Sequence, residues 1–194
     1  MTNSTETTKA ALTHYVVDAR ASRFTVQAFA TGLLSTMGHN PVIGIRTFSG
    51  DVRFGPEAAQ GSAFHFRIQA SSLTVQDDIS DKDRREMERT MNEQILEIAK
   101  YPEIIYEAPV VDIKKLGDSL YSATLDGDLT LHGVSRKQQV IARVAIFGAM
   151  LRASGDFTLN QSDYQIQPFT FAGGALKLKD QLKFSFEMVA REQQ

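Results

Sequence analysis

Four histidines and several closely spaced carboxylates are the side chains of this sequence most able to take part in catalysis or metal binding. His39 lies in a segment flanked by glycine and proline, and His132 directly precedes Gly133. Histidines near chain reversals could serve as a general acid and base or could hold a metal ion. Asp126 and Asp128 are two residues apart, and in a strand this spacing places both carboxylates on one face.

The spacings that usually accompany catalysis or metal binding are absent from the sequence. It contains no H-E-x-x-H pair for zinc and no G-x-S-x-G turn for a nucleophilic serine. It also contains no cysteine, which excludes disulfides, thiolate metal ligands and a cysteine nucleophile. We therefore predict no catalytic residues, no metal and no cofactor. An enzyme that uses His39 and His132 remains an alternative.

Charge gives little indication of a charged partner. The formal net charge of −2 lacks the basic footprint of nucleic-acid binding, so we expect no nucleic-acid partner. Arg84, Arg85 and Arg89 could meet a phosphate near the start of a helix, where the helix dipole favours anions. Because Glu86 and Glu88 lie among these arginines, a solvated helix face explains the cluster equally directly.

The elements that must position these side chains are mostly strands. Apolar and polar residues alternate with period two through most of the chain, which is typical of strands with one buried face. Gly55-Pro56 and Gly117-Asp118 mark reversals between them. Because strands follow one another without intervening helices, we predict an all-β fold, a single antiparallel eight-stranded barrel.

One amphipathic helix is predicted from Asp81 to Lys100, with Met87, Met91, Ile95 and Ile98 forming its apolar stripe. Ser80 precedes it as an N-cap, and Tyr101-Pro102 ends it because proline disfavours helical geometry in the preceding residue. We expect this helix to lie near an open end of the barrel. It either completes the core or also lines a ligand chamber, since binding sites prefer barrel mouths.

The inward faces of the strands combine large aromatic residues with alanine and glycine. Small residues facing each other could leave a channel, and an eight-stranded barrel can hold either packed side chains or one small ligand. Ordinary close packing is the alternative. The residues predicted to line the interior are Phe24, Val26, Phe64, Phe66, Ile68, Tyr106, Tyr121, Leu125, Val144, Phe157, Phe184 and Phe186.

The ends of the sequence suggest a loose tail and one domain. Residues 1–13 are rich in threonine and serine, so we predict a flexible tail there and a single domain from 14 to 194. No secretory signal and no apolar run of about eighteen residues is present. The expectation is a cytoplasmic protein that does not span a membrane.

Residues 127–134 read G-D-L-T-L-H-G-V. Together with several other short segments, this stretch resembles the YceI-like family of lipid-binding proteins. It is the most specific of the segments, and the order and spacing of all of them strengthen the resemblance. It covers about Tyr15 to Ala190. The other segments are 15–18 with 22–26, 48–50, and 83–84 with 101–106.

This resemblance implies a lipocalin-like barrel that acts as a non-catalytic carrier. The hydrophobic ligand would be a long isoprenoid-type lipid, either a polyprenyl carrier or an isoprenoid quinone; some relatives bind fatty acids or their amides. A filled structural or stress-linked barrel without a ligand, able to form a homodimer through an exposed strand, remains an alternative. The residues that could contact a head group or form the rim are His39, Asn40, His132 and Arg85.

Overall fold

The computed structural model describes residues 11–31, 40–171 and 176–193. Residues 1–10 of the predicted tail, and His39, lie outside the described residues.

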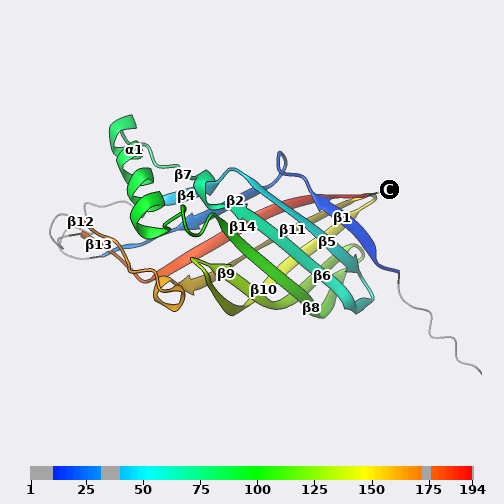
Figure 1. Cartoon of the computed structure of the whole chain (residues 1–194). Helices are drawn as coiled ribbons and strands as arrows, with labels where there is room; N and C mark the ends of the chain where they lie inside the picture. Colours follow the sequence, from blue (N-terminus) through cyan, green and yellow to red (C-terminus); the bar gives the residue numbers. More distant parts are fainter. Residues whose placement is uncertain (1–10, 32–39, 172–175, 194) are drawn as a thin grey trace, which may run out of the picture.

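The wall of the molecule is a ring of eight antiparallel strands, as predicted (Figure 1). Each strand pairs with the next, and β1 closes the ring by pairing with the last strand, Val17 opposite Ala190. In ring order the strands are β1 (Thr13–Val17), β5 (Phe48–Gly55), β6 (Ala58–Gln69), β8 (Glu103–Gly117), β9 (Leu120–Leu131), β10 (Val134–Phe147), β11 (Met150–Asn160) and β14 (Gln181–Glu192).

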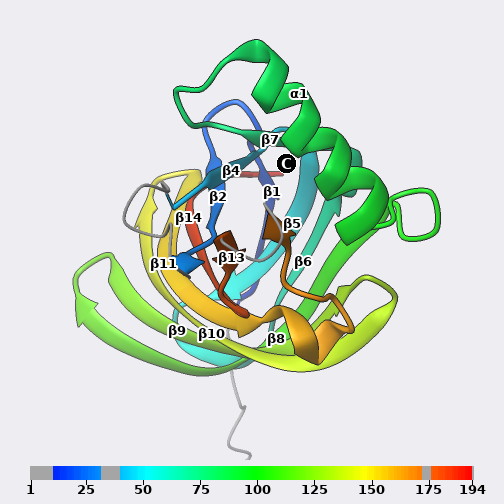
Figure 2. The ribbon, with the colours of Figure 1, turned by 90° about the vertical axis from the view of Figure 1, so that its left-hand side faces the viewer.

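Three short strands extend the wall toward one end of the barrel. β2 (Arg23–Gln27) pairs with β14, β4 (Val42–Ile45) pairs with β2, and β7 (Leu73–Val75) pairs with β4. At the same end lies a small sheet of β3 (Ala30–Thr31), β12 (Thr170–Phe171) and β13 (Leu176–Leu178). Figure 2 looks into this end, which we call the mouth.

The bend between β1 and β2 is held by Asp18. Its carboxylate accepts the backbone N–H of Arg20 at 3.1 Å and the Nε–H of Arg191 on β14 at 2.8 Å. The hydrogen bond from Arg191 holds the pKa of the Asp18 carboxyl below its ordinary value. The first strand can therefore change direction while remaining attached to the wall.

The helix at the mouth is shorter than the sequence predicted. α1 (Asp81–Thr90) continues as a π-helical turn, η2 (Met91–Ile95), and the helix ends there instead of at Lys100. The N-cap prediction is confirmed, because the N–H of Asp83 donates to Ser80 Oγ at 3.1 Å. The helix stops early because Glu97 adopts a left-handed conformation with φ of 44°, which helical backbone cannot continue.

α1 is attached to the free edge of β7. The guanidinium of Arg84 donates to the backbone oxygens of Val75 and Asp77, the latter at 2.8 Å. Glu88 Oε1 accepts the N–H of Val75 at 2.9 Å. Both backbone polar groups of Val75 are thus satisfied by side chains of α1, which crosses the mouth where β7 and β8 do not pair.

An aromatic cluster occupies the barrel interior. The Phe24 ring centroid lies 4.7 Å from that of Phe48 and 4.6 Å from that of Phe66. Near the hairpins opposite the mouth, Phe54 and Tyr121 meet edge to face at 6.1 Å.

Of the described helices, none is long and apolar enough to cross a membrane.

Candidate functional site

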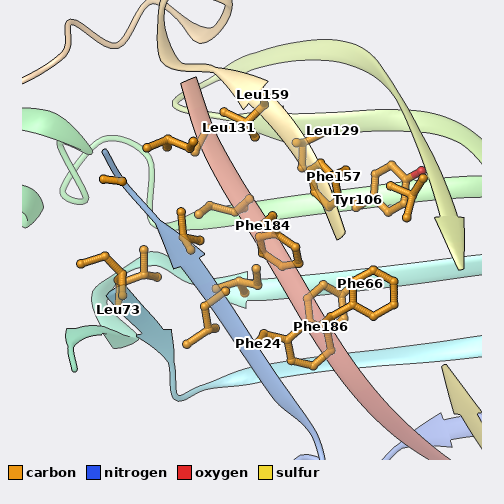
Figure 3. A pocket seen from close by; sticks show the side chains of 18 of the residues that line it. Phe24, Phe66, Leu73, Tyr106, Leu129, Leu131, Phe157, Leu159, Phe184 and Phe186 are labelled. Atoms are coloured by element: carbon orange, nitrogen blue, oxygen red, sulfur yellow. The ribbon is translucent and has the colours of Figure 1, made fainter. Parts of the chain in front are cut away.

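A cavity of about 480 Å³ lies inside the barrel, between the wall and the helix at the mouth. Figure 3 shows side chains from several strands converging on it, among them Phe24, Phe66, Tyr106, Phe157 and Phe184. Its wall is overwhelmingly apolar, and the only charged residues described around it are Glu86 and Arg89 of α1. In the alternative of a filled barrel without a ligand, side chains would occupy this space.

The structure brings the predicted interior residues together around this cavity, with one exception. Tyr121 is buried, with 8% of its surface exposed, but it does not line the cavity. It packs against Phe54 instead, at the end of the barrel opposite the mouth. Period-two alternation identified the face of Tyr121 correctly and could not give its depth along the barrel axis.

The helix contributes two rows of residues to the cavity, one apolar and one polar. Met87, Met91 and Ile95 recur every fourth residue, and the partly buried Met91 and Ile95 pack against the core. The polar row begins at Glu86 and continues through Thr90 to Gln94. The helix therefore closes the cavity with an apolar surface and offers polar groups at its edge.

The segment after β11 adds lining residues that sequence reasoning did not include. Gln161 is 4% exposed, and its side-chain amide donates to the backbone oxygens of Lys179 at 3.0 Å and Asp180 at 3.3 Å. Ile166 is also buried and lines the cavity. Gln161 continues the alternation of Phe157 and Leu159, so its inward direction could have been inferred.

Tyr106 lines the cavity, and its hydroxyl reaches the backbone of a neighbouring part of the wall. The hydroxyl donates to the backbone oxygen of Gln138 on β10 at 2.9 Å. Burial raises the pKa of Tyr106 well above its ordinary value, with a further contribution from Asp126. The phenol therefore stays neutral, and its O–H group is engaged in the hydrogen bond to the Gln138 carbonyl.

Replacing Tyr106 with phenylalanine tests whether this hydroxyl serves the wall or a ligand. We expect Tyr106→Phe to lower the free energy of unfolding by about 1 kcal/mol, because the Gln138 carbonyl loses its donor. The affinity for an apolar ligand should stay within about twofold, measured by fluorescence titration beside chemical denaturation. A loss of affinity with unchanged stability would instead place the hydroxyl against the ligand.

His132 is a turn residue that packs outside the cavity. With φ of 52° at His132 and 73° at Gly133, the two residues form the tight connection between β9 and β10. The imidazole Nε2 lies 3.0 Å from Glu97 Oε2, and the ring centroid lies 4.4 Å from that of Tyr101. The side chain is 10% exposed and does not line the cavity, so His132 ties the end of the helix to the wall.

The other predicted rim residues are not gathered at the cavity either. Asn40 Oδ1 accepts the N–H of Ala30 at 3.0 Å, and Arg85 Nε donates to the backbone oxygen of Asp81 at 3.1 Å. Neither residue lines the cavity. Arg84 is engaged with β7, which leaves Arg89 as the arginine of the predicted phosphate cluster at the cavity. Over the described ranges, no three histidine or carboxylate side chains are placed to hold a metal ion.

The fold and the cavity together define the class of protein. A closed eight-stranded antiparallel barrel around an apolar chamber is the architecture of the small β-barrels that enclose a single ligand.

The family follows from a match over most of the sequence. A family model described as a YceI-like domain matches residues 15–190, so the chain belongs to the YceI-like family. The resemblance predicted from the short segments is thereby confirmed. No curated protein matches the sequence significantly.

Several solved structures share the fold at low sequence identity. BcnA of Burkholderia cenocepacia is 20% identical with a TM-score of 0.65, and the match covers 89% of this chain and 98% of the BcnA chain. A polyisoprenoid binding domain from Saccharophagus degradans is 15% identical with a TM-score of 0.67, covering 94% of this chain and 100% of its own. The Campylobacter jejuni YceI protein is 15% identical with a TM-score of 0.59, covering 78% and 85%.

Proposed function

We propose that this protein binds a single lipid with an isoprenoid-type chain in the barrel cavity and acts as a carrier without chemical turnover. The observation that supports this most strongly is the cavity itself, which is apolar from the aromatic cluster to the helix. The family membership and the structural likeness to a domain described as polyisoprenoid binding point in the same direction.

The size of the cavity suggests how much of such a chain it holds. Its volume of about 480 Å³ corresponds to at least roughly sixteen groups of the size of a water molecule or a methylene, at about 30 Å³ each. That is at least roughly three five-carbon isoprene units. A longer chain would extend out of the cavity, and additional units should then add little affinity.

Burial of the chain supplies a large share of the binding free energy. At about 0.8 kcal/mol per methylene, an isoprene unit contributes roughly 3 kcal/mol. Three units contribute roughly 10 kcal/mol, against association costs of about 4–15 kcal/mol. Polar contacts to the head group therefore add affinity as well as selectivity between head groups.

Native mass spectrometry of protein purified from its own host tests the proposal directly. We expect a bound apolar molecule with one copy per chain, released on denaturation and identified in the organic extract. Delipidated protein should then take up farnesol, a three-unit isoprenoid alcohol, with one-to-one stoichiometry. Protein that carries no apolar molecule from the host and takes up no farnesol would contradict the carrier function.

A further inference from the structure

The pairing between β10 and β11 is interrupted in the half nearest the mouth, and we call this interruption the opening. The two strands pair from Phe147 opposite Met150 as far as Arg143 opposite Ser154, and the pairing stops there. Both strands nevertheless continue, β10 back to Val134 and β11 on to Asn160. On their other edges they remain fully paired, β10 with β9 and β11 with β14. The interruption is therefore confined to the line where these two strands face each other.

A polar groove lies over this opening. It measures about 520 Å³ and is lined from both strands and from the short helix η3 (Gln161–Tyr164) that follows β11. Leu159 borders both the groove and the inner cavity, and Figure 3 shows it near the end of β11. The groove residues are Arg136, Lys137, Gln138, Thr158, Leu159, Asn160, Asp163, Tyr164 and Gln181.

Hydrogen-bond donors dominate the chemistry of the groove. Toward the described residues, Arg136 uses only its Nε–H, which donates to the backbone oxygen of Asp163 at 3.1 Å, so the outer nitrogens of its guanidinium make no hydrogen bond there. The side chains of Thr158 and Gln181 make no hydrogen bond to the described residues. A guanidinium with free N–H groups beside an amide and a hydroxyl suits an anionic group rich in oxygen.

The groove can widen without disturbing the rest of the mouth. η3 is fastened on the side of β14, where the Asp180 carboxylate accepts the N–H of Ser162 at 2.8 Å and its hydroxyl at 2.5 Å. The backbone N–H of Gln161 also donates to the Asp180 carbonyl at 2.9 Å. Toward β10, the hydrogen bond from Arg136 to Asp163 is the link described. Separating η3 from β10 breaks this hydrogen bond and uncovers the side chain of Tyr164, which is 2% exposed.

The helix offers a less suitable place for an anion at the cavity. Arg89 lines the mouth, but Glu86 lies one turn earlier on the same helix and lines it too. Their opposite charges leave that edge close to neutral. The groove also contains a carboxylate, that of Asp163, but Arg136 and Lys137 both line it, so its summed formal charge is positive and favours an anionic head group.

We propose that the groove over the β10–β11 opening is a head-group site for a phosphate-type lipid. The isoprenoid chain lies in the cavity, the molecule passes the opening beside Leu159, and the free nitrogens of Arg136 hold the anionic oxygens. This inference rests on the proposed lipid-binding function and assigns the chemistry of the head group that accompanies the chain.

Two ligands with the same chain and different heads test this site. Farnesyl phosphate and farnesol are titrated against the wild-type protein, Arg136→Ala and Arg89→Ala. Arg143→Ala is the matched control, because Arg143 is exposed on the same strand in its paired half. We expect Arg136→Ala to weaken farnesyl phosphate binding about tenfold and to leave farnesol binding within about twofold. Arg143→Ala should change neither affinity by more than about twofold. Arg89→Ala should affect farnesyl phosphate no more than it affects farnesol.

The outcomes separate this inference from the function on which it rests. If Arg136→Ala behaves like Arg143→Ala, or if Arg89→Ala is the variant that loses farnesyl phosphate, the groove is not the head-group site, while farnesol binding still supports the carrier function. If the wild-type protein binds neither ligand, the carrier function itself is wrong and the site falls with it.

Discussion

Replacing Ala142 with phenylalanine is expected to abolish lipid binding while the barrel still folds. Ala142 lies on β10, is 5% exposed and lines the cavity. A phenyl ring there enters empty space, so the overpacking that usually destabilises such substitutions is small. The ring occupies about the volume of one isoprene unit, whose burial contributes roughly 3 kcal/mol, so affinity should fall at least about a hundredfold.

The neighbouring residue provides the control for this experiment. Ile141 is 57% exposed on the outer surface, so Ile141→Phe adds a similar ring to the same strand without entering the cavity. Farnesol titration and thermal unfolding are measured for both variants. Binding by a folded Ala142→Phe variant at wild-type affinity would mean that the lipid does not occupy this cavity. Ala142→Leu should show a smaller loss, which links the effect to volume.

Replacing Gly127 with alanine is expected to cost about 3 kcal/mol of folding free energy, at the upper end of overpacking penalties. A Cβ at this position would lie 2.3 Å from the Cβ of Ala108 and 2.3 Å from the backbone oxygen of Glu107. Backbone atoms of β8 cannot rotate away as a side chain can, so the pairing of β8 and β9 must loosen. Denaturant unfolding measures the change.

Gly117→Ala, at the last residue of β8, is the matched substitution. A Cβ there would meet the Cβ of Leu120 at 3.7 Å, an ordinary contact, so stability should change by no more than about 0.5 kcal/mol. Equal effects of the two substitutions would show that the loss at Gly127 arises from a general property of glycine in strands, and that close approach to β8 is not its cause.

Much of the fold could be predicted from the sequence because strand alternation reports directly which face is buried. Leu129 and Leu131 face the interior as their alternation predicts, and both line the cavity. The helix boundary could not be predicted in this way. Ile98 continues the apolar spacing of the helix and is partly buried, yet it follows the left-handed Glu97 and lies outside the helix. Apolar spacing alone therefore predicts a helix that is longer than the one the backbone forms.

The candidate site was less predictable because its geometry depends on contacts distant in sequence. His132 resembles a rim residue until Glu97 and Tyr101, more than thirty positions earlier, are seen to cover it. Tyr121 faces inward but lies beyond the cavity, since alternation carries no information about depth. The opening between β10 and β11 has no sequence signal, because both strands alternate normally while their pairing ends at Arg143 and Ser154.

The attachment of α1 to β7 has a consequence for solubility. The last strand of an open sheet edge presents unpaired N–H and C=O groups that can recruit a strand from another molecule. At Val75 those groups are occupied by Glu88 and Arg84, so the helix blocks strand addition at this edge as well as covering the mouth. Any motion that swings α1 fully away from the barrel uncovers a surface able to nucleate aggregation, which sets a limit on how far the mouth can safely open.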